Sequence, residues 1–387
     1  MKPESHHAAG IAFGGLIALA AAMGVGRFVY TPILPFMVDD LGLSAPAAGV
    51  IASANFLGYL LGALAAAAGA LPGGRRAWFL AGLTLSALTT GAMGFAGSMT
   101  AFVLLRLAGG AASAFVLVFA SALVLDRLAA AGRPGLTAVH FAGVGVGIAV
   151  SAVLVATLGG LGFGWRAQWL AGGALSLGAL GAAAWLVPRG LPVEASSDTR
   201  PTDRRDRRLA ALTVAYGLFG FGYVITATFI STMVRAEPSL RAIEPVVWLA
   251  VGLAAVPSVA LWAWIGRRWG NDRGFALACL VEAVGVAISV LVADPAVVLV
   301  AAALLGGTFM GITALGLIHA RALAAGDPRR LLALMTAAFG LGQMIGPTFA
   351  GVVHDLGGGF TAPSLAAAAA LVVAAGLVVR RPMRGGA

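Results

Sequence analysis

Twelve apolar stretches, each about as long as a lipid bilayer is thick, occupy almost the whole chain, and the charged residues lie between them. A helix that rises ~1.5 Å per residue needs about 20 apolar residues to cross ~30 Å of hydrocarbon. Only 10% of the residues are charged, whereas soluble domains carry about a quarter. Because backbone groups inside lipid must be hydrogen-bonded internally, the pattern predicts an all-α, polytopic membrane protein with 12 transmembrane helices.

We predict membrane-spanning helices at residues 11–37, 46–70, 77–96, 100–126, 135–158, 166–187, 209–234, 244–266, 274–293, 296–320, 331–354 and 361–379. An even number of spans places both termini on one side of the membrane. Twenty of the 25 Lys and Arg residues fall on that side, and only Arg166, Arg235 and Arg241 on the other. Because basic loops stay in the cytoplasm, we expect cytoplasmic N- and C-termini in a multi-pass protein of the bacterial inner (plasma) membrane.

The net charge of +10 is spread over the loops and tails of one face rather than gathered on one contact surface. Anionic lipid headgroups suffice as partners for such a distribution, so we expect no nucleic-acid partner. The sequence contains no ATP-binding motif, no metal-ligand cluster and no Ser-His-Asp signature. We therefore expect no enzymatic activity, cofactor or metal, and a monomer whose partners are the lipid bilayer and a small-molecule substrate.

The chain divides at its single long polar segment, which predicts an N-terminal six-helix bundle (1–187), a cytoplasmic linker (188–208) and a C-terminal six-helix bundle (209–387). Glycine pairs recur between the halves at offsets of 196 or 197 residues: Gly24/Gly26 with Gly220/Gly222, Gly109/Gly110 with Gly306/Gly307, and Gly143/Gly145 with Gly340/Gly342. Two pseudo-symmetric bundles are typical of transporters that rock about a midplane cavity.

Arg27 lies within the first span, where an uncompensated charge costs about 3 kcal/mol or more. Helical spacing places Arg27, Tyr30 and Thr31 on one stripe, and Pro32 loosens the backbone beyond them. The stripe favours a cavity-lining anchor for an anion. The alternatives are an arginine that reaches outward or pairs with Asp39 or Asp40, and a purely structural contact between helices.

Arg106 lies in the fourth span on a small, polar face that includes Ser113. Small residues permit close helix packing or leave room for a substrate. Both a role in the cavity and a structural pairing remain open for Arg106.

The seventh span carries Tyr216 and Tyr223 on one face, with Thr226 almost one turn further. Substrate contact and hydrogen bonding between helices are equally consistent with these side chains. In the eleventh span, Gln343 is a candidate hydrogen-bonding group of the cavity, and Gly346 with Pro347 predicts a helix that flexes.

His140 and Glu282 are further titratable groups within spans. Histidine titrates near neutral pH and could carry a coupling proton, although a histidine at a helix end facing the cytoplasm fits equally well. Glu282 is the only acid near the middle of a span and is either a proton site or a buried, neutral structural residue.

Two segments carry a resemblance to a known family: residues 24–35 (Gly-Val-Gly-Arg-Phe-Val-Tyr-Thr-Pro-Ile-Leu-Pro) and residues 216–228 (Tyr-Gly-Leu-Phe-Gly-Phe-Gly-Tyr-Val-Ile-Thr-Ala-Thr). Both segments resemble the YbfB/YjiJ-type branch of the major facilitator superfamily (MFS). The broader resemblance to the superfamily covers the full chain. Arg106 and Gly110 match an Arg-x-x-x-Gly pattern that is associated with proton coupling in that superfamily. The loops after the second and eighth spans lack the family's usual Asp, and Ile148 replaces the Pro that follows Gly143-x-x-x-Gly147 in many exporters.

The resemblance implies the MFS fold and alternating access, with spans 1, 4, 7 and 10 around the cavity and Gly143 and Gly147 among the gating positions. We therefore expect a proton-linked secondary transporter of a small organic solute, with efflux favoured over uptake. Arg106, His140 and Glu282 are the candidates for proton coupling. Two arginines and no acid on the lining helices favour an anionic or zwitterionic solute. The alternative is a non-transporting membrane sensor or lipid-handling protein on the same fold.

Overall fold

The computed structural model describes residues 3–68, 72–188, 207–323 and 328–379, and within these ranges it contains helices and no strands. The helices are α1 (Pro3–Leu19), a π-helical segment (Ala20–Val25), α2 (Tyr30–Leu41), α3 (Ala45–Ala67), α4 (Arg75–Ala92), α5 (Met99–Ala130), α6 (Thr137–Gly160), α7 (Trp165–Leu186), α8 (Arg207–Ala236), α9 (Glu244–Trp269), α10 (Asn271–Leu291), α11 (Pro295–Leu323), α12 (Pro328–Gly357) and α13 (Thr361–Val378). α1, the π-helical segment and α2 together form the first span.

All twelve predicted spans coincide with these helices, which confirms the all-α fold of a polytopic membrane protein. Among the described residues, eleven helical segments are long and apolar enough to cross a membrane, and α12 is the further helix of the bundle. Large apolar side chains face outward, such as Trp185 at 85% exposure and Leu104 at 58%. Lipid tails can cover these side chains, so they need no protein partner.

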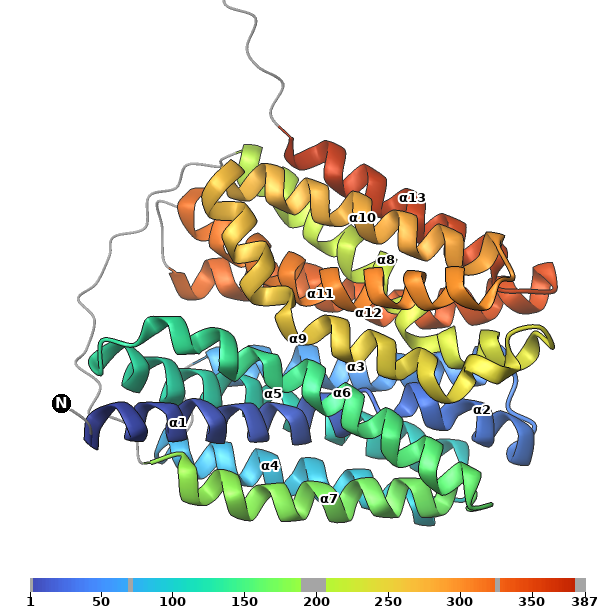
Figure 1. Ribbon diagram of the computed structural model, residues 1–387, viewed down its shortest axis with the longest axis horizontal. Helices are drawn as coiled ribbons and strands as arrows, with labels where there is room; N and C mark the ends of the chain where they lie inside the picture. Colours follow the sequence, from blue (N-terminus) through green and yellow to red (C-terminus); the bar gives the residue numbers. More distant parts are fainter. Residues whose placement is uncertain (1–2, 69–71, 189–206, 324–327, 380–387) are drawn as a thin grey trace, which may run out of the picture.

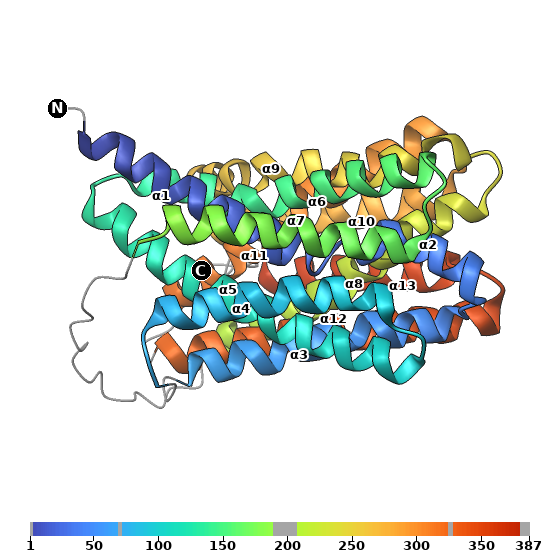
Figure 2. The same cartoon turned by 90° about the horizontal axis from the view of Figure 1, so that it is seen from below.

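Helices α1–α7 pack as one bundle and α8–α13 as a second bundle beside it (Figure 1). The start of α1, the end of α7, the start of α8 and the end of α13 lie at one end of the molecule, which we call the linker end (Figures 1 and 2). The opposite end carries the α2–α3 and α8–α9 connections, and we call it the far end. Apart from Pro188, Arg207 and Arg208, the linker predicted at 188–208 lies outside the described residues.

The two bundles contact each other mainly through α3 with α12, α6 with α9, and α2 with α8. Small residues make these approaches possible. A Cβ added at Gly252 of α9 would lie 2.4 Å from the backbone nitrogen of Ala149 in α6. Close backbone packing of this kind holds helices together in a bilayer, where apolar side chains gain little by leaving lipid for protein.

The first span is interrupted rather than continuous. The π-helical segment ends at Val25, a turn follows over 26–29, and α2 begins at Tyr30. The backbone N–H of Thr31 bonds to the carbonyl of Phe28 at 3.2 Å, so the carbonyl of Arg27 is left for another donor. The uniform stripe expected from helical spacing is therefore broken at its centre. π-Helical turns of this kind are frequent at functional sites.

Candidate functional site

Arg27 is buried and joins the two bundles. Its guanidinium donates a hydrogen bond of 2.9 Å to the side-chain oxygen of Gln343 in α12. The amide nitrogen of Gln343 in turn donates to the hydroxyl of Tyr223 in α8. All three side chains are buried. The sequence predicted each of them separately, and the structure brings them together.

Aromatic rings of the N-terminal bundle enclose the Arg27 guanidinium. Its central carbon lies 4.0 Å from the ring centroid of Tyr59, 4.8 Å from that of Phe56 and 5.4 Å from that of Phe28. Cation–π attraction of this kind stabilises a buried cation that lacks an acidic partner. No acid of the described chain forms an ion pair with Arg27.

The C-terminal bundle contributes a second set of rings. Tyr223 stacks on Phe309 of α11 at a centroid distance of 5.7 Å and on Phe339 of α12 at 5.9 Å. Tyr216 lies 5.1 Å from Phe339, and its hydroxyl donates to the backbone carbonyl of Thr313 at 3.1 Å. The Arg27 cation and the Gln343 amide are thus surrounded by aromatic rings. We call this set the central cluster; its members are Arg27, Phe28, Phe56, Tyr59, Tyr216, Tyr223, Phe309, Phe339 and Gln343.

Arg106 supports the turn that presents Arg27. Its guanidinium donates to the backbone carbonyls of Gly26 at 3.2 Å and Arg27 at 3.0 Å. These are carbonyls at the interruption of the first span. Arg106 itself is held by α3, because Asn55 donates to its carbonyl oxygen at 2.9 Å. In this structure Arg106 thus holds the backbone turn that carries Arg27, and its role in the cavity stays a prediction.

Several predicted hydroxyl groups are directed away from Arg27. Tyr30 donates to the carbonyl of Ala48 at 2.9 Å, and Thr31 donates to the carbonyl of Ala227 at 2.7 Å. Ser113 bonds within its own helix, to the carbonyl of Gly110 at 2.8 Å. Thr226 is buried, and its hydroxyl has no hydrogen-bond partner among the described residues.

The two remaining titratable candidates lie in different bundles. His140 is fully buried, not at an open helix end, and its Nε2 lies 3.0 Å from the hydroxyl of Ser121. A Cβ added at Gly15 would lie 2.3 Å from the His140 ring, so the ring fills a gap between α1 and α6. Glu282 of α10 is fully buried in the C-terminal bundle.

The predicted gating positions are sites of close packing. Cβ atoms added at Gly143 and Gly147 of α6 would each lie 2.2 Å from a backbone oxygen of the first span. Gly346 packs against Val224 of α8, and Pro347 lies inside α12 against Gly49 of α3. Pro32 lies in the first turn of α2. Flexing at these residues stays a prediction.

Sequence reasoning missed two aromatic residues and one amide of α3: Tyr59, Phe56 and Asn55. A signal was available, because the chain has only four tyrosines and every one of them is buried. A lone Asn in an apolar span with a Tyr one turn later marks the same helix face.

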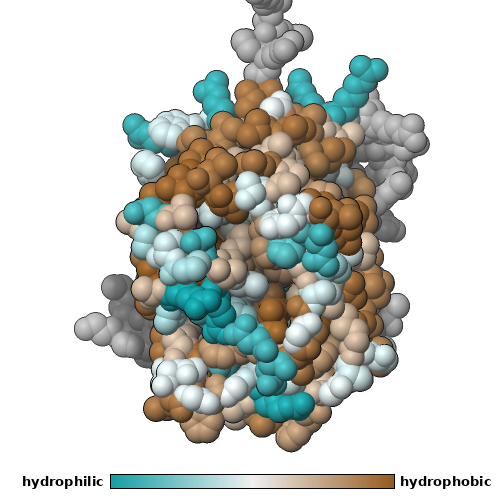
Figure 3. Space-filling view, turned by 90° about the vertical axis from the view of Figure 1, so that its right-hand side faces the viewer, coloured by the Kyte–Doolittle hydropathy of each residue, from teal (hydrophilic) through white to brown (hydrophobic). Residues whose placement is uncertain are grey.

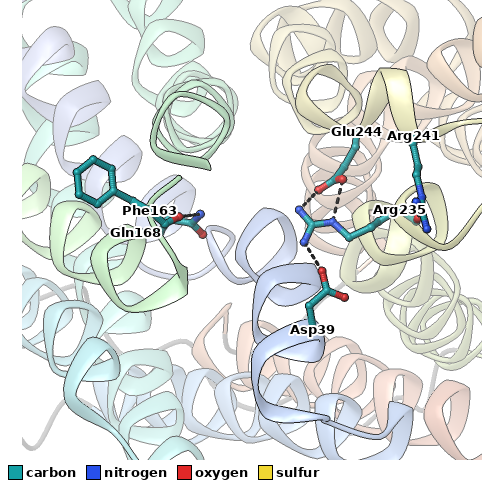
Figure 4. A network of polar contacts seen from close by, with 6 residues as sticks. All are labelled: Asp39, Phe163, Gln168, Arg235, Arg241 and Glu244. Atoms are coloured by element: carbon teal, nitrogen blue, oxygen red, sulfur yellow. Dashed lines mark hydrogen bonds and ion pairs between the residues drawn. The ribbon is translucent and has the colours of Figure 1, made fainter. Parts of the chain in front are cut away.

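A network of charged side chains links the bundles at the far end (Figure 4). Arg235 of α8 donates to Asp39 of α2 at 2.9 Å and pairs with both carboxyl oxygens of Glu244 in α9. Its guanidinium lies 3.9 Å from the ring centroid of Phe36. The pairing of Arg27 with Asp39 or Asp40 is therefore not observed, since Asp40 accepts from the indole of Trp165 at 2.6 Å.

Two six-helix bundles packed around a buried cation, without strands in the described chain, define a membrane transporter of the major facilitator class. A family model described as uncharacterised MFS-type transporter YbfB matches residues 19–379. The chain belongs to this family.

Relatives and solved structures agree with this assignment. A gallate transporter of Pseudomonas putida is 31% identical over 156 residues, which cover 40% of this chain and 34% of that protein. The crystal structure of nucleoside transporter NupG superposes with a TM-score of 0.71 at 17% identity, covering 94% of this chain and 97% of that chain. A bacterial homologue of the human lysosomal transporter Spinster, inward-facing and occupied, gives 0.71 at 14% identity, covering 94% of each chain. The structural matches show the fold.

Proposed function

We propose that the chain is a proton-linked secondary transporter that moves a small organic anion or zwitterion by alternating access. Arg27 carries this proposal. It is a buried cation where the bundles meet, it has no acidic partner in the described chain, and its Nε has no hydrogen-bond partner there either. A carboxylate would supply both the missing charge and the missing acceptor.

The rings around Arg27 favour an aromatic carboxylate over an aliphatic one. A ring whose carboxylate binds Arg27 would lie among the rings of Tyr59 and Phe56, which contact the guanidinium, and could exchange stacking contacts with them. Gln343 can exchange its present bonds for hydroxyl or amino substituents on the ring. Gallate, a hydroxylated benzoate, combines these features. The Pseudomonas putida relative that matches part of this chain is named a gallate transporter.

The transport cycle would be rocking of residues 1–187 against 209–387, with the linker end in the cytoplasm of a bacterial inner-membrane protein. Basic side chains concentrated at the linker end support this orientation. The central bond between Arg27 and Gln343 would break and reform in each cycle. We expect a monomer, because each chain contains a complete cluster. Efflux, which the family resemblance favours, stays the expected direction.

The test is uptake of radiolabelled gallate and benzoate into liposomes that contain the purified protein. Arg27→Gln removes charge-assisted hydrogen bonds worth about 1.5–3 kcal/mol, so affinity should fall roughly tenfold to 150-fold. Arg133→Gln, which changes an exposed loop arginine, is the matched control and should transport normally. Undiminished transport by Arg27→Gln would refute the anion site. No flux of any solute would favour the sensor or lipid-handling alternative.

A further inference from the structure

Glu282 is a buried acid that the central cluster does not contain. It lies in α10, which packs against α11, α13, α9 and α8. Neither carboxyl oxygen has a hydrogen-bond partner among the described residues. The hydroxyl of Thr308 in α11 faces it but donates to the backbone carbonyl of Leu304 at 2.7 Å.

Among the residues that the structure describes, no cation forms an ion pair with Glu282. α13 has no ionisable residue, and those of α11, His319 and Arg321, lie near its linker end. α9 carries its charged groups, Glu244 and the arginines at 267 and 268, at its two ends. α8 carries Arg207, Arg208 and Arg235 at its two ends with Tyr216 and Tyr223 between them, and Cys279 of α10 itself lies about one turn from Glu282. An ionised carboxylate here would be an uncompensated buried charge, so the neutral acid fits this conformation.

A cavity of about 500 Å³ opens between the bundles at the far end. Figure 3 shows this end face-on, with hydrophilic side chains running across it between hydrophobic flanks. Its walls come from both bundles and include Leu34, Val38, Phe229, Met233, Ser289 and Phe360. Glu237 and His354 are its ionisable lining residues, and His354 pairs with Asp355 at 3.1 Å. Because both bundles form its walls, the cavity must change shape when they rock.

Glu282 and Ser289 lie on one face of α10. They are seven residues apart, which is two helical turns or ~10.5 Å along the axis. Ser289 lines the cavity, so the buried acid lies two turns beneath it. A modest opening of α10 from α11 or α13 would let water reach the carboxyl from the far end.

The other candidates for proton coupling are already engaged. Arg106 holds two backbone carbonyls, and His140 lies in the other bundle against Ser121. Glu282, in contrast, lies in the same bundle as Tyr223 and Gln343, which bond to each other, and Gln343 accepts a hydrogen bond from Arg27.

We propose that Glu282 is the proton-binding group of the transporter and that it takes up its proton through the far-end cavity. The inference rests on the proposed function. A hydronium ion transfers its proton to the Glu282 carboxylate, leaving water and a neutral acid, and the reverse transfer to water on the other side completes the cycle.

The first test needs no substrate. Infrared difference spectra of the purified full chain between acidic and alkaline pH should show the carbonyl band of a protonated carboxyl in an apolar site, shifted in D₂O. Glu282→Gln should lose this band. Asp126→Asn, which removes a half-exposed acid at the linker end, should keep it. A band that persists in Glu282→Gln, or that is missing from the unaltered protein, overturns the proposal.

The second test separates coupling from transport, with gallate as the probe. Glu282→Gln should keep gallate counterflow, because counterflow needs no net proton movement. The accumulation of gallate driven by a pH gradient should fall at least tenfold in this variant. Accumulation that stays at the level of the unaltered protein overturns the proposal. If no variant carries gallate but the infrared band behaves as expected, the proposed substrate fails and the proton site stands.

Discussion

The far-end ion pair between Asp39 and Arg235 makes a quantitative prediction about the conformational equilibrium. It joins the bundles, whereas the neighbouring pair of Arg235 with Glu244 lies within the C-terminal bundle. Asp39→Asn should therefore favour conformations in which the far end is open. Glu244→Gln, which removes a charge from the same arginine without touching the junction, is the matched control.

The size of the shift follows from exposure. The Asp39 side chain is 64% exposed and that of Arg235 only 19%. Exposed pairs contribute about 0.2–1 kcal/mol because water and salt screen them. Arg235 keeps Glu244 in the variant, so no unpaired charge is added to this cost. The ratio of open to closed molecules should rise roughly 1.4- to 5-fold.

The shift can be measured with spin labels on Leu161→Cys and Leu291→Cys, two exposed far-end positions in different bundles. The only native cysteine, Cys279, is buried and should not react. Electron–electron distance distributions should broaden toward longer values in Asp39→Asn. Salt at 1 M, where the screening length is about 3 Å, should move the unaltered protein the same way. Identical distributions in Asp39→Asn and the unaltered protein, or an equal shift in Glu244→Gln, would refute the role of the junction.

Two further predictions concern the interrupted first span. Arg106→Lys keeps the charge but loses the forked donor geometry that bridges two carbonyls, so thermal unfolding in detergent should show a loss of about 1–3 kcal/mol together with weaker gallate binding. Weaker binding at unchanged stability would mean that Arg106 touches the anion instead. Gly147→Val would place a Cβ 2.2 Å from the carbonyl of Ala20, so the yield of monodisperse protein should collapse. Gly160→Val is the control, because a Cβ at Gly160 meets nothing within 4 Å, and this variant should express normally. Equal yields of Gly147→Val and Gly160→Val would count against the close packing of α6 on the first span.

The sequence alone determined the order of the long helices and the class of fold. These follow from hydropathy over windows of about 20 residues, which is a local property that no tertiary contact needs to correct. The internal repeat of glycines was equally visible, because it is a comparison of the chain with itself. The sequence also pointed to Arg27, Tyr223 and Gln343, because polar side chains are rare within apolar spans and are costly there unless they are paired or functional.

Only the tertiary structure decided what these side chains do. Arg27 and Gln343 are 316 residues apart, and no spacing rule connects residues on different bundles. Arg27 and Arg106 looked alike in the sequence, yet the guanidinium of Arg27 bonds to a side-chain amide whereas that of Arg106 bonds to backbone carbonyls. The interruption of the first span separates their roles, because the carbonyls of Gly26 and Arg27, in the turn after the π-helical segment, are acceptors that an intact helix would have consumed.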